Sequence, residues 1–196
     1  MASLVALAEL PPEEIVWVAG EPHVLAGERD WATIAGSFDG GVRPHRQAKV
    51  GGAGAWIWEK GAHGWQPLAK VVVALPGETS APRAEAHGCR ALLLTLLRLG
   101  DRARRACLAG DNLAVVRHAA TRGRLMAPRV HGVLEFALQQ SALAGWEVQW
   151  SAVRRRFNQQ ADEAATEGVQ WARSLWDQGC REPQWTAQWF GQPPPQ

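Results

Sequence analysis

The sequence predicts an α/β domain whose elements follow the order β-β-β-α-β-α-α-β-α. Two observations support this order. β-favouring segments at hairpin-like spacing fill the first part of the chain. In the second part, segments with helical periodicity alternate with short apolar strands. With 196 residues and 46% hydrophobic content, the chain is long enough for one packed core with flanking arms.

Three strands are expected first. The segment WATIAGSFDGG begins at Trp31 and leads into Asp39-Gly40-Gly41, and GGAGAWIWEK and WQPLAKVVVAL follow it. Each segment contains β-branched and aromatic residues, which favour strands, and turn-forming residues separate the segments. Pro76-Gly77 then ends the strand pattern.

The rest of the domain alternates helices and strands. Thr79 or Ser80 suits an N-cap, Pro82 suits a first helical turn, and apolar residues recur at helical spacing from Glu85 to Leu99. The short apolar strand RRACLAG follows and ends at Asp111. The remaining elements are helices over about 112–121 and 128–144, the strand WEVQWSAV, and a last helix from Asn158 toward residue 175.

Both ends of the chain differ in composition from the domain between them. Residues 1–30 are acidic and contain three prolines, which predicts an arm or linker before a domain at 31–176. Residues 177–196 end in GQPPPQ and predict an irregular tail. Its tryptophans, Trp185 and Trp189, are expected to stack on bases or to pack on the domain.

Charge is distributed unevenly although the net charge is only +2. Residues 1–40 hold seven acidic residues and one basic residue, whereas residues 90–160 hold twelve arginines and four acidic residues. The arginine-rich part suits a polyanion because a guanidinium matches phosphate oxygens, and a solvated basic face is the alternative explanation.

The cysteines and the apolar segments indicate where the protein resides. Three cysteines without CxxC spacing argue against a disulfide framework or a zinc site and favour an intracellular location, cytoplasmic or nuclear. The N-terminal segment lacks the basic region of a signal peptide, and no stretch approaches the ~18 apolar residues of a membrane span. We therefore expect no membrane partner.

Four carboxylates carry the candidate chemistry: Asp39, Glu85, Asp111 and Asp162. Singly, each has an ordinary explanation as a turn residue, a helix first-turn acid, an N-cap or a solvated helix position. On the predicted topology, however, strand ends and helices bring them to one crevice. Clustered carboxylates repel unless a cation neutralises them, and oxygen-only ligands favour Mg²⁺ or Mn²⁺.

The motifs around these acids resemble those of a known family. SFDGG, GGAGAWIW, APRAEAHGCRALL, LAGDN and VRRRFNQQADEAA are similar in order and spacing to the motifs of the ribonuclease H family, in the variety found in retroelement polyproteins and plant-type domains. The resemblance covers roughly residues 31–175. It implies a ribonuclease H-like fold, with a five-stranded mixed sheet flanked by helices.

The resemblance also implies an activity and a role for each acid. Family members cleave the RNA strand of RNA–DNA hybrids with two divalent ions, Mg²⁺ or Mn²⁺, bound together with substrate. Asp39 matches the aspartate that bridges both metals, Glu85 the helix glutamate, Asp111 the aspartate after the fourth strand and Asp162 that of the last helix. The expected catalytic and metal-binding residues are these four. The expected partners are a hybrid nucleic acid and, if the chain is part of a polyprotein, adjacent domains; otherwise we expect a monomer.

Substrate contacts are expected around the same motifs. The candidates are Gly40 and Gly41, through uncovered backbone amides, together with Asn112, Arg154 and Asn158, the last being equally suited to capping a helix. Candidates for the phosphates of the DNA strand are the arginines at 117, 122, 124 and 129.

One position departs from the pattern of many family members. They carry a histidine in the loop before the last aspartate, and this chain has Arg154-Arg155-Arg156-Phe157 there. Arginine holds a phosphate but is no general base at neutral pH. Two alternatives to hybrid cleavage therefore stand: a weak or inactive ribonuclease H-like module that binds nucleic acid, and a related nuclease acting on DNA or double-stranded RNA.

Overall fold

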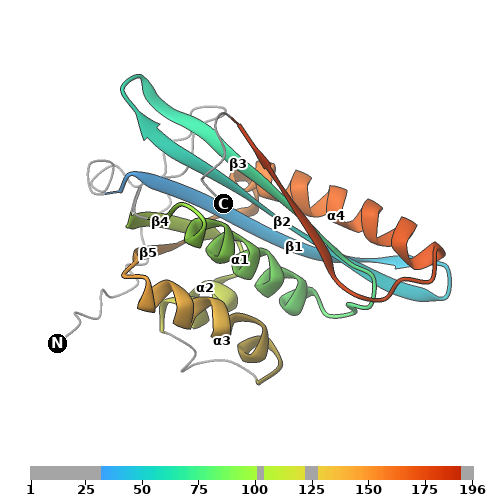
Figure 1. Cartoon of the computed structure of the whole chain (residues 1–196). Coiled ribbons are helices and arrows are strands. Elements are labelled where there is room, and N and C mark those ends of the chain that lie inside the picture. The colour runs from blue at the N-terminus through green and yellow to red at the C-terminus, as the bar shows by residue number, and fades with distance from the viewer. Residues whose placement is uncertain (1–31, 101–103, 122–127, 191–196) are drawn as a thin grey trace.

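A computed structural model describes residues 32–100, 104–121 and 128–190, which form a mixed six-stranded sheet with helices on both faces (Figure 1). The strand order across the sheet is β5-β4-β1-β2-β3-β6. The strands are β1 (Ile34–His45), β2 (Ala48–Gly61), β3 (Gly64–Leu75), β4 (Arg105–Gly110), β5 (Glu147–Ala152) and β6 (Gln184–Trp189). The helices are α1 (Ala81–Leu97), α2 (Leu113–Ala120), α3 (Pro128–Leu143), the short 3-10 helix η2 (Arg155–Phe157) and α4 (Gln159–Asp177).

This order confirms the predicted α/β fold. β1, β2 and β3 form an antiparallel meander, and β4 and β5 extend the sheet in parallel from the other side of β1. The N-terminal arm predicted at 1–30 lies outside the described residues. No helix in the described parts is long and apolar enough to cross a membrane.

The sheet has a sixth strand where five were expected. In the segment predicted as an irregular tail, residues 184–189 form β6, which pairs antiparallel with β3. Alternate residues of β6 explain the pairing: Ala187 and Trp189 pack against the main core, and the guanidinium of Arg98 lies 4.8 Å from the ring centroid of Trp185. Packing on the domain, one of the two roles expected for the tail tryptophans, is observed for Trp189, while Trp185 is exposed and the stacking on bases stays a prediction.

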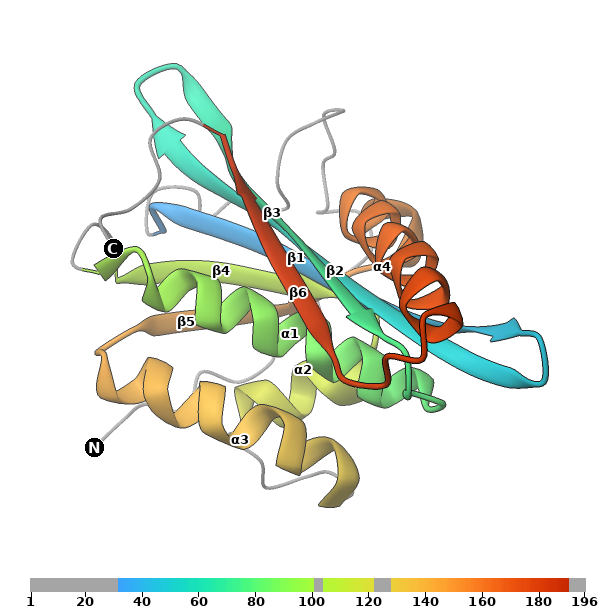
Figure 2. The same ribbon diagram turned by 45° about the vertical axis from the view of Figure 1, so that its right-hand side comes forward.

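The helices divide between the two faces of the sheet. α1 packs on β1 and β2 and contacts α3, whereas α4 packs on β1, β2 and β3 (Figures 1 and 2). Glycines in the strands show the two faces directly. A Cβ at Gly36 would meet Leu92 of α1 at 2.8 Å, whereas a Cβ at Gly52 would meet the backbone of α4 at Val169, 2.1 Å away.

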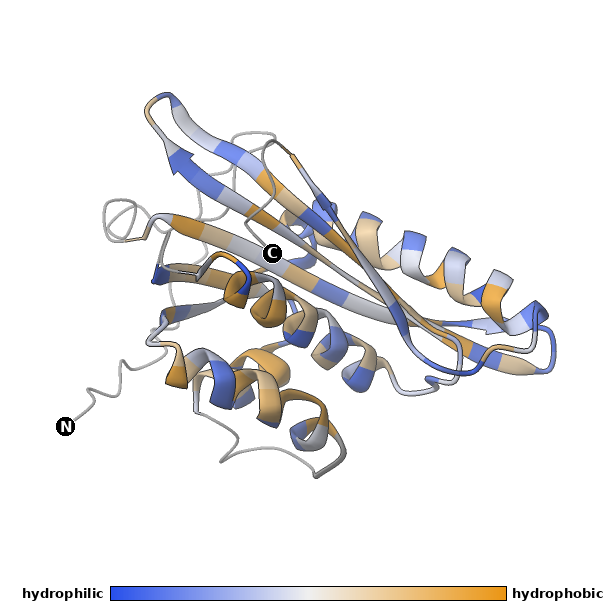
Figure 3. Cartoon of the chain, viewed as in Figure 1, coloured by the Kyte–Doolittle hydropathy of each residue, from blue (hydrophilic) through white to orange (hydrophobic). Residues whose placement is uncertain are grey.

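Two hydrophobic clusters hold these layers together. The larger lies between the sheet and α1, α2 and α3, and it includes Phe38, Leu92, Leu108 and Leu134. The smaller, around Val169, joins α4 to the edge of β2 and β3. Hydrophobic and hydrophilic residues alternate along α4, as expected for a helix with one face on the sheet (Figure 3).

The start of α1 differs in detail from the prediction. Ser80 is the N-cap residue and Pro82 lies in the first turn, as predicted, but Ser80 makes no side-chain cap hydrogen bond. Glu78 orders the turn before the helix, because its Oε1 accepts hydrogen bonds from the amides of Thr79 and Ser80 at 3.0 and 2.9 Å. Its other oxygen pairs with Arg83 at 2.8 Å. These contacts fix the turn that precedes α1.

Replacing Gly54 by alanine tests the close packing of β2 against α4. An added Cβ would lie 2.4 Å from the Cβ of Ala164 and 2.5 Å from the amide nitrogen of Ala165, so the helix must shift. We expect Gly54→Ala to lower the free energy of unfolding in urea by roughly 2–4 kcal/mol. Gly61→Ala is the matched control on the same strand, because the nearest atom to its Cβ would be 3.6 Å away. Equal stability of the two variants would contradict the packing.

Candidate metal centre

Two adjacent parallel strands deliver the first two carboxylates. β1 and β4 run side by side, and Phe38 is paired with Gly110 at the end of their shared register. Asp39 and Asp111 are the next residue along each strand. Although β1 continues to His45, the register of the two parallel strands aligns these positions, so the two aspartates are neighbours, as the sequence predicted.

Helix α1 brings the third carboxylate, and glycines allow it to come close. A Cβ at Gly40 would lie 2.2 Å from the carbonyl carbon of Ala84, so no side chain fits between β1 and the first turn of α1. Gly88, one turn further on, makes a similar approach, since its Cβ would lie 2.4 Å from the carbonyl oxygen of Asp39. Glu85 lies between these contacts and is therefore held against β1.

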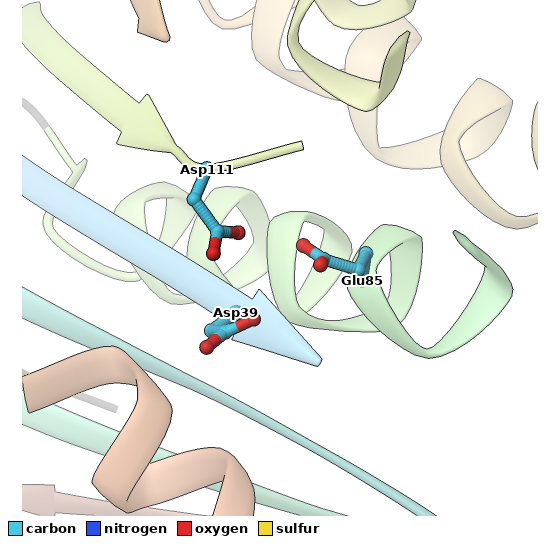
Figure 4. Close-up of side chains that lie close together, drawn as sticks. All are labelled: Asp39, Glu85 and Asp111. Carbon is cyan, nitrogen blue, oxygen red and sulfur yellow. The ribbon is translucent and has the colours of Figure 1, made fainter. Parts of the chain in front are cut away.

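The three carboxylates converge (Figure 4). One oxygen from each of Asp39, Glu85 and Asp111 lies within 4.8 Å of the other two. Asp39 is 4% exposed and Glu85 is 8% exposed. Glu85 Oε2 and Asp111 Oδ1 are buried and have no hydrogen-bond partner. Buried anionic oxygens without donors suit a hard divalent cation, so the residues present fit a site for Mg²⁺ or Mn²⁺.

Burial and mutual repulsion disfavour the charged forms of these acids. Burial, and then the Asp111 carboxylate, raise the pKa of Asp39 from 3.8 to about 7. Burial and the two aspartates raise the pKa of Glu85 from 4.5 to about 9. Burial also raises the pKa of Asp111, while Arg155 opposes this shift. A bound cation would reverse these shifts by compensating the charge.

The fourth predicted carboxylate, Asp162, borders this group. Its charge helps to raise the pKa of Asp39, so the two carboxylates are close. Asp162 is paired with an arginine, however: Nη2 of Arg155 donates to its Oδ1 at 2.7 Å. Sequence reasoning placed Arg154 at the substrate and gave Arg155 no role of its own. The contact could not be predicted from the spacing of residues along one helix, because Arg155 belongs to η2 and Asp162 belongs to α4.

Asn158 lies beneath the site and fixes α4 to β1. It is 1% exposed, and its Nδ2 donates to the carbonyl oxygen of Phe38 at 2.8 Å. It stands at the N-cap position of α4 but makes no side-chain cap hydrogen bond. The N-cap position expected from the sequence is therefore the one observed, although the side chain bonds to β1 and not to the helix, and the expected substrate contact stays a prediction. The side chain ties the start of α4 to the residue before Asp39.

The other predicted substrate contacts have mixed outcomes. The amide of Gly40 donates to Oδ1 of Asp39 at 2.7 Å, so it is not uncovered as expected. Gly41 is open, with only the Arg43 side chain within 4 Å of a Cβ placed there. The Asn112 side-chain oxygen caps α2, accepting from the amides of Ala114 and Val115 at 3.1 and 3.3 Å. Arg154 is exposed.

The arginines predicted for DNA phosphates are only partly visible. Arg117 is exposed on α2. Residues 122 and 124 lie outside the described residues, and so does the side chain at 129. Their role stays a prediction.

The fold of this chain is similar to the folds of several solved structures. The N-terminal RNase H domain of a Mycobacterium tuberculosis protein, solved as a fusion with maltose-binding protein, is 25% identical, with a TM-score of 0.61 over 74% of this chain and 99% of that chain. LC11-RNase H1 in complex with an RNA/DNA hybrid is 21% identical, with a TM-score of 0.59 over 71% and 98% of the two chains.

A viral multidomain protein is a third relative in structure. The foamy viral protease-reverse transcriptase in complex with an RNA/DNA hybrid is 13% identical, with a TM-score of 0.56 over 83% of this chain and 23% of that chain. At this identity the likeness concerns the fold alone. No family model and no curated protein matches the sequence.

Replacing Asp39 tests the repulsion in the metal-free site. Folding raises the pKa of Asp39, so the folded chain binds the proton of this carboxyl more tightly than the unfolded chain does. As pH rises from about 4 through about 7, the proton is lost and the folded state becomes less stable relative to the unfolded state. We expect Asp39→Asn to raise the free energy of unfolding in EDTA by roughly 1–3 kcal/mol at pH 8, and by less at pH 5. Urea titrations at both pH values measure this.

The matched control is Asp177→Asn at the far end of α4. That carboxylate is partnered by His45 at 2.9 Å and by Arg46 at 3.2 Å, and these groups lower its pKa. Its replacement should give no stabilisation at pH 8. An Asp39→Asn variant no more stable than the wild type in EDTA at pH 8 would contradict the repulsion.

Proposed function

We propose that this chain, which belongs to the ribonuclease H family, is a divalent-metal-dependent endonuclease that cleaves the RNA strand of RNA–DNA hybrids. The observation that carries the proposal is the cluster of Asp39, Glu85 and Asp111, buried and unneutralised at the edge of a ribonuclease H fold. Carboxylates in this arrangement destabilise the protein unless they hold a cation. Their presence together therefore points to a use.

The four predicted carboxylates would hold the metal. Asp39, Glu85 and Asp111 form the core of the site, and Asp162 is a fourth ligand at its border. Two bound Mg²⁺ or Mn²⁺ ions would supply an activated water for in-line attack on phosphorus and charge stabilisation for the leaving 3′ oxygen. The chain itself contributes position: β1, β4 and α1 are packed so closely that the carboxylates keep their geometry without a ligand.

The proposed substrate follows from the relatives and from the charge of the chain. LC11-RNase H1 was solved with an RNA/DNA hybrid, and its fold is shared. Reading a hybrid requires contacts to 2′-hydroxyls and phosphates, because bases in an A-like duplex are poorly accessible. Exposed Arg155 lies at the border of the carboxylate cluster, exposed Arg154 precedes it in the chain, and both are suited to phosphate contacts. Binding through them should weaken as salt rises.

Adjacent domains are a further part of the proposal. The foamy viral relative carries the matching fold as 23% of a larger chain, in which a protease and a reverse transcriptase are joined. A comparable arrangement here would supply hybrid-binding surface that the described residues offer only sparsely. Without such a partner we expect the chain to act as a monomer.

One observation favours the second candidate function, a nucleic-acid-binding module with little catalysis. The loop before Asp162 has arginines where many family members have a histidine, and Arg155 is bound to Asp162 itself. A guanidinium does not exchange protons at neutral pH, so these arginines cannot take over proton transfer from such a histidine.

A cleavage assay separates these functions. Labelled RNA–DNA hybrid, double-stranded RNA and double-stranded DNA are incubated with the full chain and Mg²⁺ or Mn²⁺, and the products are resolved on a gel. We expect metal-dependent cutting of the RNA strand of the hybrid alone. Asp39→Asn and Asp111→Asn should each reduce its rate at least about a thousandfold, because each removes a metal ligand.

Asp177→Asn controls for the removal of a carboxylate from α4 at a distance from the cluster, and it should cut like the wild type. Tight hybrid binding without metal-dependent cutting would favour the binding module. Cutting of double-stranded RNA or DNA in place of the hybrid would assign the chain to another nuclease class. Equal cutting by the wild type and Asp39→Asn would overturn the proposed site.

A further inference from the structure

The guanidinium of Arg155 lies at the border of the metal centre. Nη2 of Arg155 lies 2.7 Å from Oδ1 of Asp162, and the guanidinium also interacts electrostatically with Asp39 and Asp111. Arg155 is 67% exposed and Asp162 is 38% exposed, so this pair faces solvent at the rim of the buried cluster. In the metal-free chain, Arg155 thus supplies part of the charge compensation that the carboxylates lack.

This contact is specific to one of three consecutive arginines. Arg156 turns to the ring of Phe157, with its guanidinium carbon 4.5 Å from the ring centroid. The backbone that presents Arg155 is held in place, because the amide of Asn158 donates to the Arg155 carbonyl at 2.9 Å and the Asn158 side chain is anchored on Phe38. Only the Arg155 side chain has to move for the pair to open.

A divalent cation and Arg155 cannot both have full use of Asp162. The guanidinium occupies Oδ1, one of the two oxygens that Asp162 can offer to a metal ion. The guanidinium and a metal ion at such a short distance also repel each other. We propose that Arg155 is an internal counter-ion that competes with the divalent cation for Asp162, so that metal loading releases its guanidinium for a substrate phosphate.

The release has a chemical consequence for the proposed function, on which this second half of the inference rests. The fork of a guanidinium pairs with one carboxylate or with one phosphate, but not with both through the same donors. While Asp162 holds the Nη2 donor of Arg155, that donor cannot serve a phosphate, and phosphate binding is weakened. Once metal has taken Asp162, the same side chain can swing to the nucleic-acid backbone. Metal and substrate would then favour each other's binding through Arg155.

The competition is tested by metal binding alone. Metal-stripped full chain is titrated with Mn²⁺ without nucleic acid, and free Mn²⁺ is followed by electron paramagnetic resonance. We expect Arg155→Gln to bind Mn²⁺ about threefold to tenfold more tightly than the wild type, because an exposed ion pair and a nearby repulsion are removed. Arg155→Lys keeps the charge and should stay within about twofold of the wild type.

Arg156→Gln is the matched control, since it removes the same charge from the neighbouring residue without touching Asp162. It should change the Mn²⁺ affinity by less than about twofold. Thermal melts in EDTA verify that each variant is folded. An Arg155→Gln variant that binds Mn²⁺ no more tightly than Arg156→Gln overturns the competition. A wild-type chain that binds no Mn²⁺ overturns both the competition and the proposed metal dependence.

The release is tested by hybrid binding. Fluorescence anisotropy gives the affinity for a labelled hybrid in Ca²⁺ and in EDTA, and a gel verifies that the hybrid stays intact. The wild type should gain affinity on addition of Ca²⁺, and Arg155→Gln should gain at least about threefold less. Equal gains would overturn the release but not the competition. Binding of Mn²⁺ with no hybrid binding under either condition would overturn the release and the proposed substrate together.

Discussion

Backbone-to-backbone packing of helices on the sheet is the constraint on which the rest of this structure depends. Gly40 and Gly88 let α1 approach β1, and Gly54 and Gly168 let α4 approach β2 and β3. At each position a Cβ would lie 2.2–2.4 Å from atoms of the facing element. Helices that pack through side chains lie farther from a sheet. Here the close approach brings carboxylates from a strand and a helix within reach of one cation.

That geometry has an electrostatic cost. Asp39 and Glu85 are buried almost completely, and burial together with repulsion raises the pKa of both. Natural proteins keep such destabilised groups where a ligand or a reaction needs them. The Arg155–Asp162 pair reduces the cost at the rim, where solvent still reaches. Deeper in the cluster, Glu85 Oε2 and Asp111 Oδ1 are left without a partner.

The edge of the sheet at β3 is covered by the last strand, β6. β6 covers residues 69–74 of β3, which would otherwise present unpaired backbone groups at the edge of the sheet. Ala187 and Trp189 pack against the main core, whereas Trp185 is exposed and lies under the guanidinium of Arg98, which follows α1. Phe190, just beyond the strand, stacks on Trp56 at 5.3 Å. The segment after α4 is thus part of the domain.

The sequence alone was enough to predict the element order and to nominate the carboxylates. Periodicity and turn residues are local signals, so they placed β1 to β5 and the helices with small errors at the ends. The prediction missed β6, because prolines on both sides of it suggested irregular structure and its partner strand lies more than 100 residues earlier. It did not anticipate that the amide of Gly40 is engaged by Asp39 or that the Asn158 side chain anchors α4 on β1, and the substrate contacts expected at these residues stay predictions.

What only the tertiary structure decided is which groups meet. Asp39 and Asp111 meet because β1 and β4 pair in this register, and Glu85 joins them because glycines let α1 pack directly on the backbone of β1. Neither the register nor the helix packing can be predicted from a short segment of sequence. The pairing of Arg155 with Asp162 likewise depends on how η2 turns into α4 above Phe38. Sequence determines residue chemistry and local conformation, whereas charge burial and ion pairing arise from distances between elements far apart in the chain.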